Sequence, residues 1–69
     1  MNANEKIIEF VSFCIEEYRF KHYLSGDVVV KLFEKNKIID FLINNYEILH
    51  TQSKQYIQEE IDMLIGGKS

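Results

Sequence analysis

Proline is absent from this 69-residue chain, and glycine occurs only as Gly26, Gly66 and Gly67. Because proline and glycine are the residues that interrupt helices most strongly, so few breakers favour helices along the whole chain. The only strand-like run, Val28 to Val30, is short, and no second run of this kind exists to pair with it. We therefore expect an all-α fold, a small single-domain bundle of four helices over residues 1–69.

Apolar residues at helical spacing place the four expected helices at residues 5–22, 27–35, 38–45 and from near 51 or 53 to 66. Polar side chains that can accept a hydrogen bond from a first-turn amide precede three of them. These caps are Asn4, Ser25, and either Thr51 or Ser53. Asn36 can end the second helix, since asparagine tolerates the left-handed backbone conformation found at helix C-termini.

The chain is short for independent folding, because a domain of this size buries only about 60% of the surface that its unfolded form exposes. Ordering costs about 1.5 kcal/mol per residue, and small folds usually offset it with disulfides, a metal or oligomerisation. One cysteine, Cys14, cannot form an internal disulfide, and two isolated histidines cannot build a closed zinc site. We therefore expect no cofactor, and a homo-oligomer or a protein partner as the remaining support.

Charge and hydropathy limit the location and the partner class. No basic segment followed by a long apolar run opens the chain, and no apolar window approaches the roughly 18 residues of a membrane span. A single unpaired cysteine is typical of a reducing compartment, so we expect a cytoplasmic protein that does not act at a membrane. The formal charge of −3 disfavours nucleic acid as the main partner, because phosphate binding depends on clustered Lys and Arg.

The second and third expected helices are joined by a short turn, as in a helix-turn-helix. A recognition helix presents side chains such as Arg, Lys, Asn or Gln to the major groove. The candidate, Ile38 to Tyr46, offers Asn44 and Asn45 but contains no cation, and Asp40 would repel phosphate. Two packed helices of a small bundle explain the pattern better than a DNA reader does.

Residues 44–52 (NNYEILHTQ) interrupt the helical pattern with polar, aromatic and titratable side chains. The two asparagines weaken helix propensity and open a loop. His50, Thr51 and Gln52 superficially resemble a catalytic cluster, but no spacing there indicates a nucleophile, a base and a third orienting group. We expect instead a loop that caps the last helix, with His50 on a backbone carbonyl, Leu49 in the core, and no enzymatic activity.

Four motifs carry a family resemblance, and in chain order they are Ile8 to Glu16, Ser25 to Val29, Asp40 to Leu42 and Asn45 to Gln52. Through them the chain resembles a family of small bacterial proteins of unknown function, often encoded beside a larger protein that is similar to an ADP-ribosyltransferase toxin. The resemblance covers residues 5–64, and Ser53 departs from it because the family often has glycine there. It implies an antitoxin or toxin-accessory role. It also implies a candidate interaction or structural motif made of Tyr46, Leu49, His50, Thr51 and Gln52.

The residues and the family resemblance lead to two candidate functions from different classes. The first is a protein-binding module that covers the surface of a toxin encoded nearby, steered to a basic partner by Glu59, Glu60 and Asp62. Those carboxylates can equally be a solvated helix face. The second is a small dimeric DNA-binding transcriptional regulator, against which the absence of a basic helix counts. The residues alone leave the identity of the partner and the oligomeric state open.

Overall fold

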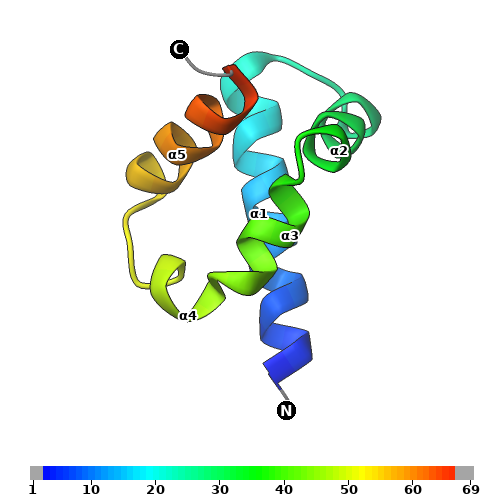
Figure 1. The fold of residues 1–69 in the computed structure, drawn as a ribbon. Helices are drawn as coiled ribbons and strands as arrows, with labels where there is room; N and C mark the ends of the chain where they lie inside the picture. Colours follow the sequence, from blue (N-terminus) through cyan, green and yellow to red (C-terminus); the bar gives the residue numbers. More distant parts are fainter. Residues whose placement is uncertain (1–2, 67–69) are drawn as a thin grey trace.

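The computed structural model describes residues 3–66, which form five helices and no strand (Figure 1). The helices are α1 (Ala3–His22), α2 (Gly26–Lys35), α3 (Ile38–Asn44), α4 (Tyr46–Leu49) and α5 (Lys54–Gly66). The expected all-α fold is confirmed, and the four expected helices correspond to α1, α2, α3 and α5. The single turn α4 is an addition, since the sequence predicted a loop there.

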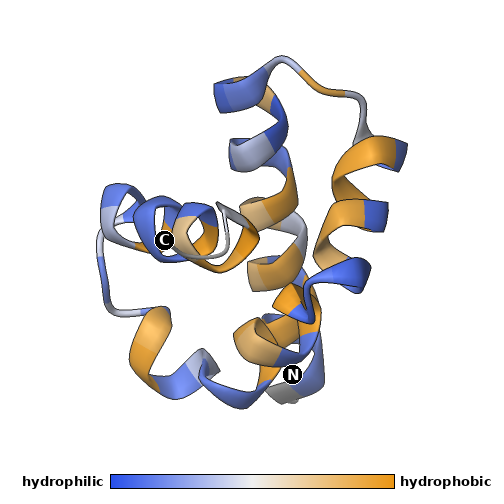
Figure 2. Ribbon diagram, turned by 45° about the horizontal axis from the view of Figure 1, so that its top comes forward, coloured by the Kyte–Doolittle hydropathy of each residue, from blue (hydrophilic) through white to orange (hydrophobic). Residues whose placement is uncertain are grey.

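Helix α1 is the central element of the fold. It packs against α2 and α3 on one side and against α5 on the other, while α4 follows α3 at the lower edge of the view in Figure 1. The apolar segments of the helices gather towards the centre of the molecule (Figure 2). Within residues 3–66, no helix is both long and apolar enough to cross a membrane.

The core is built from apolar side chains of all five helices. Its members are Cys14, Tyr18, Val29, Phe33, Ile38, Leu42, Leu49, Ile57 and Ile61. The rings of Tyr18 and Phe33 meet edge to face with their centroids 5.4 Å apart, which joins α1 to α2. Cys14 is buried as a small apolar group, and burial together with the charge of Glu17 raises the pKa of its thiol to about 12.

Two of the expected caps are present at helix starts. The Ser25 hydroxyl oxygen accepts a hydrogen bond from the Val28 amide at 3.3 Å, and the Ser53 hydroxyl oxygen accepts one from the Tyr56 amide at 3.1 Å. Of the two alternatives for the last helix, Ser53 is therefore the cap. Asn4 lies inside α1, which begins two residues earlier than predicted, so its expected capping role is wrong.

Two helices end in residues with a left-handed backbone. Tyr23 follows α1 with φ of 57°, and the next amide, that of Leu24, donates to the Arg19 carbonyl at 3.1 Å, as in a Schellman motif. After α2 the left-handed residue is Lys37, with φ of 61°, whereas Asn36 has φ of −100°. The expected end of α2 at Asn36 is confirmed, since Asn36 is its C-terminal cap; the left-handed conformation falls on the next residue, and the Asn36 side-chain amide donates to the Leu32 carbonyl at 2.9 Å.

Candidate functional site

The segment 44–52 folds as an abrupt restart of the helix rather than as an open loop. The side-chain amide of Asn45 donates to the Phe41 carbonyl at 2.8 Å, which closes the end of α3. The Asn45 carbonyl then accepts hydrogen bonds from the amides of Ile48 at 3.1 Å and Leu49 at 2.8 Å, which open α4. The same asparagine therefore ends one helix and begins the next.

Two of the five motif residues fix α4 in place. Leu49 is 4% exposed and is the buried side chain of this helix, which confirms that it lies in the core. The Thr51 hydroxyl donates to the Ile48 carbonyl at 2.8 Å, so it satisfies the end of α4 and not the start of α5 as one of the alternatives had it. Both side chains hold the segment, and neither lines the groove described below.

The other three motif residues, Tyr46, His50 and Gln52, reach the surface. The His50 ring stacks on the Tyr46 ring with centroids 4.5 Å apart and an angle of 13° between the planes. Nδ1 of His50 lies 2.8 Å from the Tyr46 carbonyl oxygen, so the expected bond to a backbone carbonyl is confirmed. Because a carbonyl only accepts, Nδ1 carries the proton and donates, which leaves Nε2 of a neutral ring as an acceptor for another molecule.

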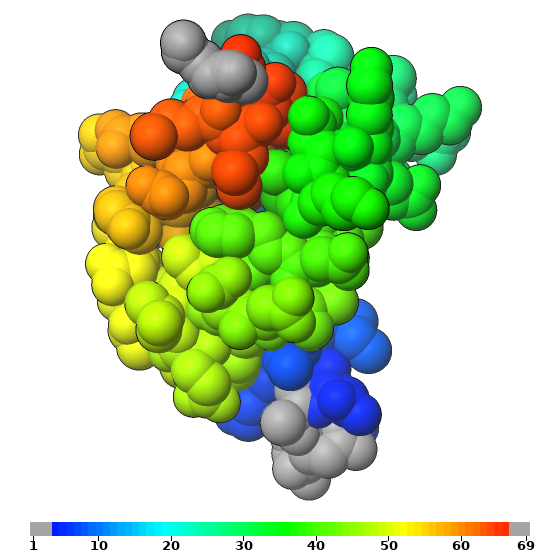
Figure 3. Space-filling model, viewed as in Figure 1, coloured from blue at the N-terminus to red at the C-terminus, as the bar shows by residue number. Residues whose placement is uncertain are grey.

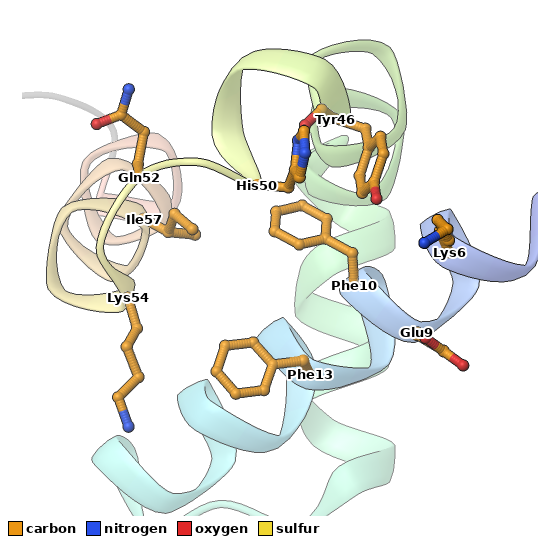
Figure 4. A pocket seen from close by; sticks show the side chains of 9 residues that line it. All are labelled: Lys6, Glu9, Phe10, Phe13, Tyr46, His50, Gln52, Lys54 and Ile57. Carbon is orange, nitrogen blue, oxygen red and sulfur yellow. The ribbon is translucent and has the colours of Figure 1, made fainter. Parts of the chain in front are cut away.

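These three residues form one wall of a groove between α1, α4 and the start of α5, with a volume of about 450 Å³ (Figure 4). The Phe10 ring meets the Tyr46 ring edge to face at 5.4 Å, and Phe13 lies beside Phe10 on α1. The Ile57 side chain closes the floor towards α5. The full lining is Lys6, Glu9, Phe10, Phe13, Tyr46, His50, Gln52, Lys54 and Ile57.

Charged side chains stand on opposite margins of this aromatic groove. Lys6 and Glu9 lie on the α1 margin, and Lys54 lies across the rings on the α5 margin, with the Glu9 carboxylate pointing away from the rings (Figure 4). Lys54 forms an exposed ion pair with Glu17 at 3.7 Å. Nothing of this opposite wall was assigned to a site from the sequence. Phe13, one of the apolar residues of α1, is 44% exposed there.

The groove lining is aromatic, with charged and amide side chains at its margins. None of the described residues form a group of three or more His, Cys, Asp or Glu side chains that could hold a metal ion. The aromatic surface can take an apolar side chain, and the charged margins and His50 can fix its orientation.

A second polar cluster joins the C-terminal end of α1 to α5. The Asp62 carboxylate accepts from Lys21 at 2.7 Å and lies 3.0 Å from Nε2 of His22. Burial, the Asp62 charge and a hydrogen bond to that carboxylate raise the pKa of Tyr18, whose ring lies 4.2 Å from the His22 ring. Asp62 is therefore paired with α1 while its side chain stays 32% exposed, so it contributes less than an unpaired carboxylate would to the acidic face expected to steer a partner.

One buried polar atom in the described part of the chain lacks a hydrogen-bond partner. Gln58 on α5 is 6% exposed, and its Oε1 accepts no hydrogen bond. The residue borders a second hollow of about 430 Å³ between α1 and α5, lined otherwise by exposed or partly exposed charged and amide side chains. A buried acceptor of this kind costs about 1–3 kcal/mol of folding free energy.

Comparison with known proteins places the chain in a family. Residues 9–68 match the family described as "Protein of unknown function (DUF3791)", and the chain belongs to it. No curated protein and no solved structure matches the chain significantly. The match extends through the whole segment that forms the groove wall, from Tyr46 to Gln52.

Proposed function

We propose that the chain is a small protein-binding module and that the groove between α1, α4 and α5 receives its partner. The observation that carries the proposal is the aromatic lining: Phe10, Phe13 and the stacked pair Tyr46–His50 form one continuous surface open to solvent. Aromatic side chains of this kind dominate the energy of protein interfaces. A partner that buries them also supplies stability that a fold of this size lacks.

An enzymatic role receives less support from the same surface. Among the described residues that line the groove there is no Ser, Thr or Cys to act as a nucleophile beside His50. Nδ1 of His50 donates to the Tyr46 carbonyl, and the open Nε2 has no such hydroxyl or thiol beside it in the groove lining from which to take a proton. A general base without a substrate-orienting partner is a weak basis for catalysis. We propose a non-enzymatic function.

The alternative of a DNA-binding regulator is disfavoured by the packing of α3. Ile38 and Leu42 are fully buried, and Ile39 and Phe41 pack against the core. These are four of the seven residues of α3, and Asp40 is among the remaining three. A recognition helix needs a face of base-reading side chains free for the major groove, whereas most side chains of α3 pack against the core.

The resemblance to proteins encoded beside an ADP-ribosyltransferase-like toxin suggests what the partner is. We infer an antitoxin or accessory role in the cytoplasm, in which the module covers part of the toxin. Glu59 and Glu60 remain available on α5 to attract a basic surface, although Glu59 also accepts a hydrogen bond from Gln55 at 3.3 Å. Asp62 contributes less, since Lys21 and His22 pair with it.

The test is co-expression with the protein encoded next to this chain, followed by titration calorimetry on the purified pair. Phe13→Ser should weaken the affinity about tenfold or more, because an aromatic anchor of an interface is removed. Phe20→Ser is the matched control: Phe20 lies on the same helix, is 66% exposed and does not line the groove. Equal affinities for both variants and the wild type would contradict the proposed binding site.

A further inference from the structure

The charges around the groove differ in sign from the charge of the whole chain. The protein carries a formal charge of −3, yet the groove is lined by two lysines and one glutamate. Of the three, Lys6 and Lys54 stand on opposite margins, and the Glu9 carboxylate points away from the rings (Figure 4). The groove is therefore an aromatic surface whose lining carries one excess positive charge on an acidic protein, and one of its two lysines, Lys54, is paired with Glu17.

Neither lysine is strongly engaged within the fold. Lys54 reaches Glu17 at 3.7 Å, and both side chains are solvent-accessible, so the pair is worth roughly 0–1 kcal/mol and can be exchanged for another carboxylate. Lys6 forms no ion pair or hydrogen bond with the described residues. Both ammonium groups can thus turn to a ligand that lies over Phe10 and Phe13.

A third basic group faces the same space. Because Nδ1 of His50 donates to the Tyr46 carbonyl, the neutral ring offers Nε2 as an acceptor, and the protonated ring offers a second N–H as a donor. Both forms can bind a polar group that follows an apolar side chain into the groove. The opposite placement of the lysines suits negative charge on both sides of that apolar side chain.

We propose that the groove recognises an acidic segment of a partner protein, in which one large apolar side chain is flanked on both sides by Asp or Glu side chains. The apolar group lies on Phe10 and Phe13, and the flanking carboxylates pair with Lys6 and Lys54. This inference rests on the proposed binding function and specifies the chemistry of the segment that enters the groove, which is separate from the basic surface that Glu59 and Glu60 would attract on α5. Carboxylates that complement Lys6 and Lys54 distinguish this segment from other peptides that place an apolar side chain on the aromatic rings.

Two synthetic peptides test the inference on the full chain. Both are acetylated and amidated and have a central tryptophan; one carries two glutamates on each side of it, and the other carries glutamines at the same places. Binding is followed by chemical shifts of ¹⁵N-labelled protein. The acidic peptide should bind about three- to tenfold more tightly, since two exposed ion pairs are added, and raised salt should remove most of this preference.

Substitutions that remove single charges show which side chains cause the preference for the acidic peptide. Lys6→Gln and Lys54→Gln should each reduce the preference for the acidic peptide about two- to threefold. Glu9→Gln should increase it, because a repelling carboxylate is lost from the margin. Lys31→Gln is the matched control, since it removes the same charge from α2, outside the groove. A merely structural role for the lysines would move the unfolding midpoint without changing the ratio of the two affinities.

The outcomes separate this inference from the function on which it rests. Equal binding of both peptides in the groove would overturn the acidic preference and leave the binding module standing. Binding of neither peptide would overturn the inference, and if Phe13→Ser also failed to weaken the natural partner, the binding site itself would be wrong. Groove shifts that depend on protein concentration without peptide would assign the groove to a second copy of the chain, and would likewise overturn it.

Discussion

Leu49 is the point at which the candidate site is attached to the core. It is the buried residue of α4, a helix of a single turn, and the groove residues Tyr46 and His50 stand on either side of it in sequence. Leu49→Ala removes most of that attachment. Deleting a buried leucine side chain costs about 2–5 kcal/mol through lost burial and a residual cavity.

The expected cost lies near the lower end of that range. A one-turn helix at the edge of the fold can move inward and reduce the cavity more easily than a central helix can, so we expect about 2–3 kcal/mol. At roughly 0.05–0.15 kcal/mol per residue, a domain of this length has about 3.5–10 kcal/mol of stability in total. The substitution should therefore lower the Tm by about 10–20 °C, given some 4–8 °C per kcal/mol in small domains.

Urea unfolding followed by far-ultraviolet circular dichroism measures the change. The control is Ile48→Ala on the same turn, since Ile48 is 64% exposed and its truncation should cost less than about 0.5 kcal/mol. Leu49→Ala should also weaken partner binding at temperatures where the rest of the protein stays folded, because Tyr46 and His50 lose their support. Equal midpoints for the two variants would refute the view that one side chain anchors the site.

Four further outcomes are expected. His50→Ala should weaken partner binding while leaving the helical content unchanged; an unchanged affinity would exclude this residue from the interface. Tyr23→Gly should raise the free energy of unfolding by about 1 kcal/mol, because a 94% exposed tyrosine there holds a left-handed backbone that glycine adopts without strain, and a lower urea midpoint would contradict this. Gln58→Met should also stabilise, by about 1 kcal/mol in the same assay, since it removes an unpartnered acceptor at similar volume; a loss of stability would show that Oε1 is bonded. Burial raises the pKa of the Cys14 thiol to about 12, so its contribution to stability is complete below pH 9 and lost as pH rises towards 12; Cys14→Ala, which cannot ionise, should lose less stability over that interval.

The sequence predicted the helices well because their signals are local. Ser25 and Ser53 each precede a helix and bond to an amide three residues later, and such caps can be read from neighbouring positions. The restart at Asn45 was missed because its low helix propensity indicates a break. In the fold, the same side chain bonds back to the Phe41 carbonyl and permits an immediate new turn.

The wall of the groove and the α1–α5 cluster were missed for a different reason. Lys21 and Asp62 are 41 positions apart, and no pattern in one sequence indicates that they form an ion pair. Glu59, Glu60 and Asp62 look alike in sequence, although Asp62 pairs with Lys21 and His22 of α1 in the fold. In the same way, nothing near the 44–52 motif indicates that Phe10 and Phe13 of α1 lie opposite it.

The groove draws its walls from the first helix, the one-turn helix and the start of the last helix, which are far apart along the chain. Any occupant therefore cross-links elements that would separate when the protein unfolds. By mass action, a ligand present at 100 times its Kd adds about 2.7 kcal/mol to the stability of the folded state. For a chain with a single cysteine, this is comparable to the stabilisation that one internal disulfide gives to other small domains, so the folded population depends directly on how much of the groove is occupied.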